Sequence, residues 1–452
     1  MEIKNLVENY SGEMIETLAQ LVSFNSVFDE SNELYPFGVE NALCLNKALD
    51  IISEFGMDVH NLDNYIGYGE IGNGDEVIGI IGHLDIVPCG NGWNTDPLKA
   101  TLIDGKIYGR GTSDDKGPVV AAMFAIKIIK DLNIPLNKKI RLIIGSNEET
   151  GGRCLEHYVK KMGHVDYGFT PDADFPGTFG EKGQIGASFS CENSKIIDIK
   201  GGAASNVVCN HVEITVNKND LNIDLFVEKL TSFEMKHEIK QLDDRYIIDV
   251  FGVAAHASTP HLGKNAINYA IVALNESGFD DCFVKEYARL IGLTIDGSLI
   301  DCNFKDEYGD LTFNNGIIKK VNNIFSCTID IRFPVTEKIA NVKEKLLNNF
   351  LSDFLIIEVV AEVEPLFYDK NSKLIKSLVS AYQSATNDFQ SQPNTMGGGT
   401  YAKGINNTIA FGGCFQGDED VHMHDANEFI KLDNLLKQCE IYTLAIMNLL
   451  EL

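Results

Sequence analysis

The sequence lacks the features that mark membrane, disulfide-rich and zinc-ribbon proteins. Its ten cysteines stand apart without one CxxC pair, and apolar runs such as residues 77–81 are far too short to cross a bilayer. Residues 1–14 are polar and lack the apolar segment of a signal peptide. Because scattered cysteines are typical of reduced thiols, we expect a cytoplasmic protein. The short apolar runs and the negative net charge of −27 predict that it has no membrane partner.

Basic residues are also scarce. The chain of 452 residues has 38 Lys+Arg against 65 Asp+Glu, a formal net charge of −27. Nucleic acids are polyanions that such a chain would repel, so they are not expected partners. The hydrophobic share is 44%, which excludes a disordered chain, and the length of 452 residues predicts roughly two to four globular domains.

Hydrophobic periodicity predicts an α/β domain at the start of the chain. Apolar positions recur at helical spacing in residues 14–22, 41–55 and 117–132, and an apolar strand follows at 140–144. Residues 65–71 and 77–81 are interpreted as a β-hairpin, because Asn73-Gly74 between them tolerates the positive φ of a type I′ turn. The order strand, helix, strand indicates a largely parallel sheet.

The pattern changes near residue 182 to shorter alternating strands, such as 211–216 and 246–253, and helices with Gly-rich loops return after about residue 365. We therefore predict a catalytic α/β domain in two parts, residues 1–182 and 369–452. Its mixed, largely parallel sheet carries helices on both faces. An inserted α+β domain of two lobes occupies residues 183–368.

The clearest candidate site follows the strand at 77–82. His83 and Asp85 lie two residues apart, and period two puts them on one face at the carboxyl end of a strand, where open α/β sheets bind ligands. A histidine there can bind a metal through one ring nitrogen while a carboxylate orients the other. Taken alone, the motif is equally consistent with a polar surface turn.

Acidic residues recur at further turns of the same sheet. Glu148 and Glu149 follow the strand at 140–144, Asp114 precedes the helix at 117, and Asp172 and Asp174 lie in a loop bounded by prolines. Adjacent residues on a strand point in opposite directions, which would let one glutamate bind a metal while the other acts as a base. Capping explains each aspartate separately, but not acids at four turns of one sheet.

Two histidines and Glu428 lie together late in the chain, at His422 and His424. With the acidic turns they form a nitrogen and oxygen donor set that suits Zn²⁺, Mn²⁺ or Co²⁺ better than copper or an iron–sulfur cluster. Two such ions about 3.5–4 Å apart would build a two-metal hydrolase.

Two glycine-rich segments do not indicate nucleotide binding. Residues 67–72 match GxGxxG but lie inside the predicted hairpin and do not open a helix. Residues 395–400 lack the Lys-Ser/Thr of a P-loop, and are better interpreted as a backbone surface that lets a small ligand approach closely.

Five motifs in chain order together resemble a known family. They are Gly82-His83-Leu-Asp85, residues 109–117, Glu148-Glu149-Thr-Gly, residues 171–176 and the late His424. This set resembles the di-zinc metallopeptidases of the aminoacylase and carnosinase clan, and within it the PepV-type dipeptidases. The resemblance covers nearly the whole chain.

The resemblance implies two divalent metal ions, Zn²⁺ above all, with Mn²⁺ or Co²⁺ as alternatives. One ion would bind His83, Asp114 and Asp172. Asp114 would bridge to the second ion, which Glu149 and His424 complete.

The same resemblance assigns the other site residues. Asp85 would orient His83, and Glu148 would be the general base that deprotonates the metal-activated water. The inserted domain would be a lid that offers His256 to the tetrahedral oxyanion. Substrate would be held by residues of the lid and of the Gly-rich loop: Asn206, Arg332, Gly398, Gly399 and Thr400.

We thus expect metal-dependent hydrolysis of the peptide bond of unblocked dipeptides. A deacylase of N-acyl or N-succinyl amino acids would have the same metal centre, and only the pocket separates the two, because an acyl group lacks the free α-ammonium. An insertion of about 180 residues favours the PepV type, whose extra lobe resembles a built-in second subunit and predicts a monomer. A binding protein without catalysis would have lost Glu148 or a ligand, and all are present.

Overall fold

The computed structural model describes residues 2–29, 32–192, 194–350 and 355–452. The chain forms two compact units. Unit 1 comprises Met1–Gly180, Tyr368–Asn394 and Gly399–Leu452, and unit 2 comprises Glu181–Phe367 and Thr395–Gly398. Among the described residues, no helix combines the length and the apolar character that a membrane span needs.

Unit 1 is built on one mixed sheet. The strand order is β1 (Asp58–Leu62), β2 (Ile66–Ile71), β6 (Lys139–Gly145), β3 (Val77–His83), β7 (Tyr167–Thr170), β23 (Thr408–Ala410) and β9 (Thr178–Glu181). The central strands β6, β3, β7 and β23 run parallel, and β1, β2 and β9 run antiparallel to their neighbours. The predicted mixed, largely parallel sheet is confirmed.

Helices cover both faces of this sheet. On one face α3 (Val39–Glu54) lies so close to β2 that a Cβ on Gly69 would come within 2.6 Å of Ile52. On the other face Tyr68, which directly precedes Gly69 in β2, packs with Leu155 and Tyr158 of α5 (Arg153–Met162). The alternation along a single strand therefore separates the two helical layers, as predicted.

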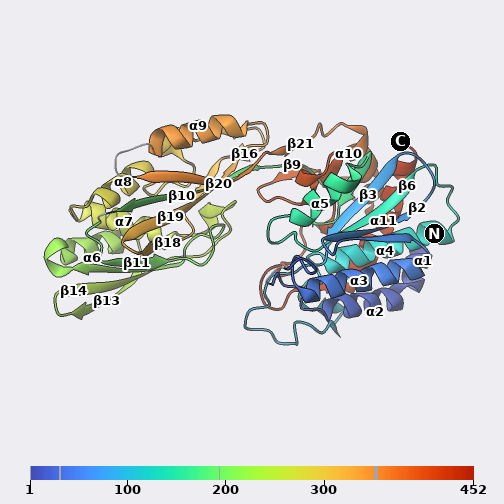
Figure 1. Ribbon diagram of the computed structural model, residues 1–452, viewed down its shortest axis with the longest axis horizontal. Coiled ribbons are helices and arrows are strands. Elements are labelled where there is room, and N and C mark those ends of the chain that lie inside the picture. Colours follow the sequence, from blue (N-terminus) through green and yellow to red (C-terminus); the bar gives the residue numbers. More distant parts are fainter. Residues whose placement is uncertain (1, 30–31, 193, 351–354) are drawn as a thin grey trace. The chain divides into compact units, whose positions relative to one another are not determined.

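Helix α4 (Lys116–Asp131) is the central helix of unit 1. It contacts β3 and β6 on one side, and α2 (Ser11–Val22) and α11 (Leu432–Leu450) on others, while α1 (Glu2–Asn9) and α10 (Lys373–Thr386) pack on α11 (Figure 1). Its residues from Lys116 to Ile126 are buried without a polar stripe. A helix that is apolar all round requires packing on every side, which these neighbours supply.

The predicted hairpin is wrong. Strands β2 and β3 are not neighbours, because β6 lies between them and pairs antiparallel with β2 and parallel with β3. The positive φ falls on Gly72 (94°), one residue before the expected Asn-Gly pair. A Cβ on Gly74 would lie 2.1 Å from the carbonyl oxygen of Asn137, so the segment packs against the entry to β6.

Short strands of unit 1 bring distant loops together. One small sheet has the order β25 (Phe429–Lys431), β5 (Lys106–Tyr108) and β4 (Thr101–Ile103), and β8 (Ala173–Asp174) pairs parallel with β24 (Gly413–Cys414). The pairing of β25 with β5 places the segment before residue 429 beside the segment after residue 108. The remaining short elements near the Gly-rich loop are β22 (Asn394–Met396) and η4 (Tyr401–Gly404).

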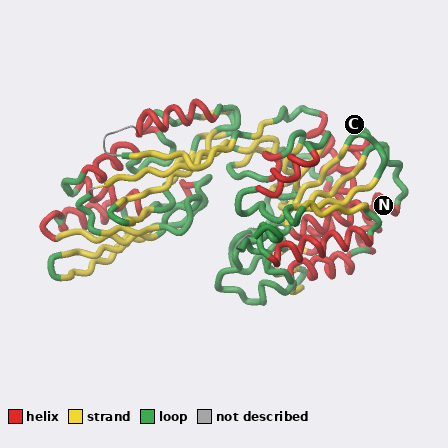
Figure 2. The backbone as a smooth tube through the Cα atoms, viewed as in Figure 1, coloured by secondary structure: helices red, strands yellow, loops and turns green. Residues whose placement is uncertain are grey.

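Unit 2 is an antiparallel sheet with helices on one face (Figure 2). The strand order is β13 (Lys236–Leu242), β14 (Arg245–Phe251), β12 (His211–Asn217), β11 (Asp198–Gly201), β18 (Ile318–Val321), β19 (Ile324–Phe333), β10 (Gly183–Glu192) and β20 (Ile356–Val363), with β17 (Thr312–Asn314) also on β19. The helices are α6 (Ile223–Ser232), α7 (Ala266–Glu276), α8 (Cys282–Leu290) and α9 (Ile339–Phe350). The predicted α+β character of the insertion is confirmed.

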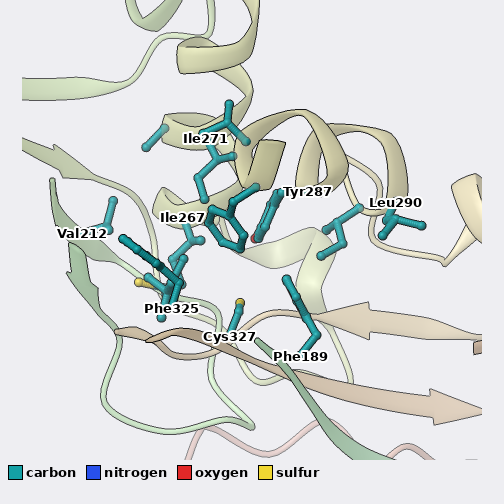
Figure 3. Packing of buried hydrophobic residues seen from close by; sticks show 14 of the residues in the cluster. Phe189, Val212, Ile267, Ile271, Tyr287, Leu290, Phe325 and Cys327 are labelled. Atoms are coloured by element: carbon teal, nitrogen blue, oxygen red, sulfur yellow. The ribbon is translucent and has the colours of Figure 1, made fainter. Parts of the chain in front are cut away.

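The core of unit 2 lies between this sheet and its helices. Figure 3 shows Ile267 and Ile271 of α7 and Tyr287 of α8 facing Phe189 and Phe325 of the strands. Along β10 buried and half-buried residues alternate, because successive side chains point to opposite faces. Short elements complete the unit: η1 (Lys218–Asp220), η2 (Pro260–Leu262), η3 (Ser298–Ile300), β15 (Lys305–Asp306), β16 (Gly309–Asp310) and β21 (Leu366–Phe367).

Candidate metal centre

Unit 1 brings all the predicted metal ligands to the carboxyl ends of its parallel strands. His83 is the last residue of β3, Glu149 follows β6, and Asp172 follows β7. Asp114 lies two residues before the start of α4, and His424 lies in the loop before β25. Parallel strands end at one edge of a sheet, which brings His83, Glu149 and Asp172 together. Asp114 and His424 reach the same place from the loops before α4 and β25.

Asp114 lies between the two histidines. Its Oδ1 is 3.1 Å from Nε2 of His83, and its Oδ2 is 2.9 Å from Nε2 of His424. Nε2 of His424 is also 3.2 Å from Oε2 of Glu149, and Nε2 of His83 is 3.8 Å from Oδ2 of Asp172. The two oxygens of one carboxylate thus face two different groups of donors.

Within the described residues, two overlapping groups have the spacing of metal ligands. The first is His83, Asp114 and Glu149, and the second is His83, Glu148 and Asp172; within each group one donor atom per residue lies within 4.8 Å of the others. Glu148 therefore lies inside the cluster, at the side of Asp172.

The electrostatics of the cluster follow from burial and from these contacts. Burial would raise the pKa of Asp114, but hydrogen bonds from His424 and His83 outweigh it and lower the pKa below its usual range. The hydrogen bond to Asp114, with that to Glu149, raises the pKa of His424 to about 11. Burial raises the pKa of both Glu148 and Glu149. Independently of these shifts, the site gathers four carboxyl side chains around two histidines.

This donor set fits divalent cations. Donor atoms on one Zn²⁺, with bonds of about 2.1 Å, lie about 3.4 Å apart at tetrahedral angles. The nitrogen–oxygen distances in the cluster, from 2.9 to 3.8 Å, have this scale. Neither group includes a cysteine, and carboxylate with imidazole suits Zn²⁺, Mn²⁺ or Co²⁺. Cations here would also offset the excess of buried negative charge.

Asp85 contacts more of the site than the sequence predicts. Its carboxylate accepts the main-chain N–H of Glu148 on Oδ1 and that of Glu149 on Oδ2, both at 3.0 Å. Nδ1 of His83 lies 3.0 Å from the main-chain carbonyl oxygen of Asp85 and 3.4 Å from its Oδ1. Asp85 thus fixes the turn that carries both glutamates, and its carbonyl is the nearer partner of the His83 ring.

Sequence reasoning did not assign roles to Asp115 and Tyr401. Asp115 is fully buried, and its Oδ2 accepts the main-chain N–H of His83 at 3.1 Å. A Cβ on Gly82 would lie 2.7 Å from that oxygen, so glycine leaves room for the contact. The buried ring of Tyr401 meets the His83 ring edge to face, with centroids 6.1 Å apart. The sequence offered one signal for these roles, which is that Asp115 directly follows the predicted ligand Asp114.

Gly145, at the end of β6, makes room for Tyr401. A Cβ there would lie 2.1 Å from the tyrosine hydroxyl, which also lies 2.8 Å from Sγ of Cys154. We expect Gly145→Ala to lower the free energy of unfolding by about 1–3 kcal/mol through overpacking, measured by urea unfolding. Gly12→Ala in α2 is the control, since nothing lies within 4 Å of its Cβ, and it should leave stability equal or higher. Equal stability of both variants would contradict this packing argument.

The predicted substrate residues of unit 2 also lie together. The N–H of Ala257 donates to the carbonyl oxygen of Asn206 at 2.8 Å, and Val207 pairs with His256 in an isolated β-bridge. Nδ1 of His256 lies 2.7 Å from Oγ of Ser258, and a Cβ on Gly397 would lie 2.5 Å from Cβ of Ser258.

Arg332 and the Gly-rich loop continue this group. Arg332 is buried, donates to both carboxylate oxygens of Asp330 at 2.6 and 3.0 Å, and donates to the carbonyl of Gly397 at 3.3 Å. Gly398 is the last residue of unit 2, and Gly399 the first of the following stretch of unit 1. Thr400 caps η4 by accepting the N–H of Ala402.

Comparison with known proteins identifies relatives along the whole chain. "Putative dipeptidase YtjP" of Bacillus subtilis (strain 168) is 33% identical over 454 residues, which cover 97% of each protein. "Putative dipeptidase SH1171" of Staphylococcus haemolyticus (strain JCSC1435) is 32% identical over 471 residues, which cover 99% of each.

Solved structures share the fold. Human carnosine dipeptidase 1 aligns with a TM-score of 0.62 at 17% identity, over 100% of this chain and 98% of that one. Aminopeptidase PepT from Bacillus cereus ATCC 10987 aligns with a TM-score of 0.58, also at 17% identity, over 97% and 98%. The sequence itself matches peptidase family M20/M25/M40 over residues 79–448. The resemblance in the motifs is therefore confirmed, and the chain belongs to this family of peptidases.

Proposed function

We propose that the protein is a dipeptidase that hydrolyses the peptide bond of unblocked dipeptides with a water activated by two divalent cations, Zn²⁺ above all and Mn²⁺ or Co²⁺ as alternatives. The position of Asp114 carries the proposal, because its two oxygens face His83 and His424 separately. A carboxylate shared by two cations requires this geometry. The names of the relatives from Bacillus and Staphylococcus support the substrate class.

Five residues of the cluster would bind the two cations in this proposal. His83, Asp114 and Asp172 would hold one cation, and Asp114, Glu149 and His424 the other. Bound cations polarise the scissile carbonyl and lower the pKa of the attacking water.

Glu148 takes the proton of that water and returns it to the leaving amine. Its side chain lies within the group formed with His83 and Asp172, and Asp85 fixes its main-chain N–H. Burial raises the pKa of Glu148, which increases its affinity for a proton. Both properties support its role as the base.

The residues outside the cluster bind substrate in this proposal. His256 would donate to the oxyanion, Asn206 and Arg332 would hold the carboxylate of the dipeptide, and the loop at 398–400 would contact its backbone. Asp330 holds the guanidinium of Arg332 in a fixed orientation, which favours the recognition of a planar carboxylate. For the other residues the resemblance remains the support.

We also propose that the enzyme acts in the cytoplasm as a monomer. All ten cysteines are free, and Cys282 is the exposed one. Thiols in this state persist in a reducing compartment. The monomer rests on the resemblance to the PepV type.

A substrate panel tests the proposed function. The protein is stripped of metal with a chelator, restored with Zn²⁺, Mn²⁺ or Co²⁺, and offered free dipeptides beside matched N-acetyl and N-succinyl amino acids. We expect no turnover after stripping, recovery with a divalent cation, and cleavage of free dipeptides alone. Cleavage of only the acylated set would make the protein a deacylase, and full activity without metal would overturn the metal-dependent mechanism.

A further inference from the structure

Glu428 occupies the interior of the turn that carries Asp114. It is fully buried, and its Oε1 accepts the main-chain N–H groups of Ser113 at 2.8 Å and of Asp114 at 3.2 Å. Its Oε2 accepts the N–H of Gly111 at 2.9 Å and Nη1 of Arg110 at 2.7 Å. One carboxylate thus satisfies four donors of a five-residue turn.

The same residue ends the loop that carries the second histidine. His424 lies four residues before Glu428, and Nε2 of this histidine contacts Oδ2 of Asp114. The two segments are joined again where the N–H of Gly109 donates to the carbonyl of Glu428, and where Oγ of Ser113 donates to that of Phe429. The side chain of Glu428 and these main-chain carbonyls together hold the segment of Asp114 beside the segment of His424.

We propose that Glu428 is a positioning residue of the metal centre, which holds Asp114 and His424 at the spacing that a cation bound by both requires. This inference rests on the metal centre in the proposed function and adds a residue that contacts no cation itself. An amide at position 428 would keep one acceptor oxygen and turn an NH2 group toward the two donors that the other oxygen served, and a shorter carboxylate would lie farther from all four donors. The turn would then move to satisfy its buried donors. Groups that orient metal ligands typically change metal affinity about 10–100-fold when replaced.

The fluorescence of Trp93 can report on the ion pair between Arg110 and Glu428. Trp93 is the single tryptophan, and the guanidinium of Arg110 lies 5.3 Å from the centroid of its ring. Nε1 of Trp93 donates to the carbonyl of Cys89 at 2.6 Å, which fixes the ring. A change in the pair of Arg110 with Glu428 alters the charge next to the indole. Tryptophan emission can therefore follow the turn without an activity assay.

The test compares Glu428→Gln and Glu428→Asp with Glu419→Gln. Glu419 is a matched control, because it lies nine residues before Glu428 and pairs with Lys106 at the surface, with 49% of its side chain exposed. Zn²⁺ and Mn²⁺ are titrated into each metal-free protein by calorimetry, and the emission of Trp93 and the melting temperature are recorded. We expect 10–100-fold weaker binding of at least one cation and altered emission in both Glu428 variants, with wild-type values in the control.

Each outcome decides the question. Wild-type affinities and emission in both Glu428 variants would overturn the positioning role and leave the proposed function intact. If Glu428→Gln melts below the temperature of the titration, Glu428→Asp decides, because it keeps the charge that Arg110 needs and shortens the side chain by one methylene group. If the wild-type protein binds no divalent cation, the proposed function fails together with the inference.

Discussion

Glu148→Gln should retain two bound cations and lose about 10²–10⁴-fold in kcat. The amide matches the size of the carboxylate and can remain in the same buried position, but it cannot accept a proton from the attacking water. The main-chain N–H of residue 148 keeps its bond to Asp85 in the variant, so the turn with Glu149 should be preserved. Metal analysis of the purified variant, beside kcat on a cleaved dipeptide, measures both properties.

The control for this variant is Glu156→Gln on the exposed surface of α5, which makes the same chemical change away from the cluster. It should leave kcat and metal content unchanged. Near-full turnover of Glu148→Gln would show that another group accepts the proton. A loss of one cation would instead identify Glu148 as a metal ligand. Its side chain has the spacing of a ligand in the group with His83 and Asp172, so the metal analysis tests this alternative directly.

A gathering of acids and histidines at one edge of the sheet could be predicted from local patterns and one general rule, whereas the individual ligands were implied by the family resemblance. Each apolar strand ends visibly at a charged residue, as at His83, and the carboxyl ends of parallel strands meet at one edge. The buried helix α4 and the parallel centre of the sheet followed from periodicity in the same way. These inferences required no knowledge of which strand lies beside which.

The order of the strands could not be predicted in this way. Asn73-Gly74 is a strong local signal for a hairpin, yet β6 enters between β2 and β3 from more than 50 residues further along the chain. In the centre of the sheet, the side chains of residues 140–144 are buried on both faces, which stabilises β6 in that position. Such non-local pairing outweighs the preference of one turn, and two residues of sequence cannot reveal it.

The supporting contacts of the site were also hidden from sequence reasoning. The alternation of residues placed the carboxylate of Asp85 on the side of His83, and its Oδ1 lies 3.4 Å from Nδ1 of that histidine. The sequence did not reveal that both oxygens also accept the N–H groups of Glu148 and Glu149. Glu428 was grouped with His422 and His424 in the candidate donor set, but its carboxylate accepts four donors from residues more than 300 positions away. Main-chain donors leave no trace in the side-chain sequence, so these roles appear only in the fold.

Asp114→Ala should abolish the binding of both cations and with it the activity on dipeptides. Oδ1 faces His83 and Oδ2 faces His424, so this one carboxylate contacts both histidines. With it removed, His83 and Asp172 on one side, and Glu149 and His424 on the other, each keep too few donors for a closed site.

The matched control is Asp174→Ala, which removes an exposed acid two residues after Asp172 that belongs to neither ligand group. It should bind two equivalents and keep its kcat, as metal analysis and dipeptide turnover will record. Two equivalents in Asp114→Ala would disprove the bridging position, and one would restrict Asp114 to a single cation. The second result would still leave His83 and His424 as the centres of separate sites, because each contacts a further carboxylate, Asp172 and Glu149 respectively. The number of cations lost from this one variant therefore measures how far the two sites depend on a shared ligand.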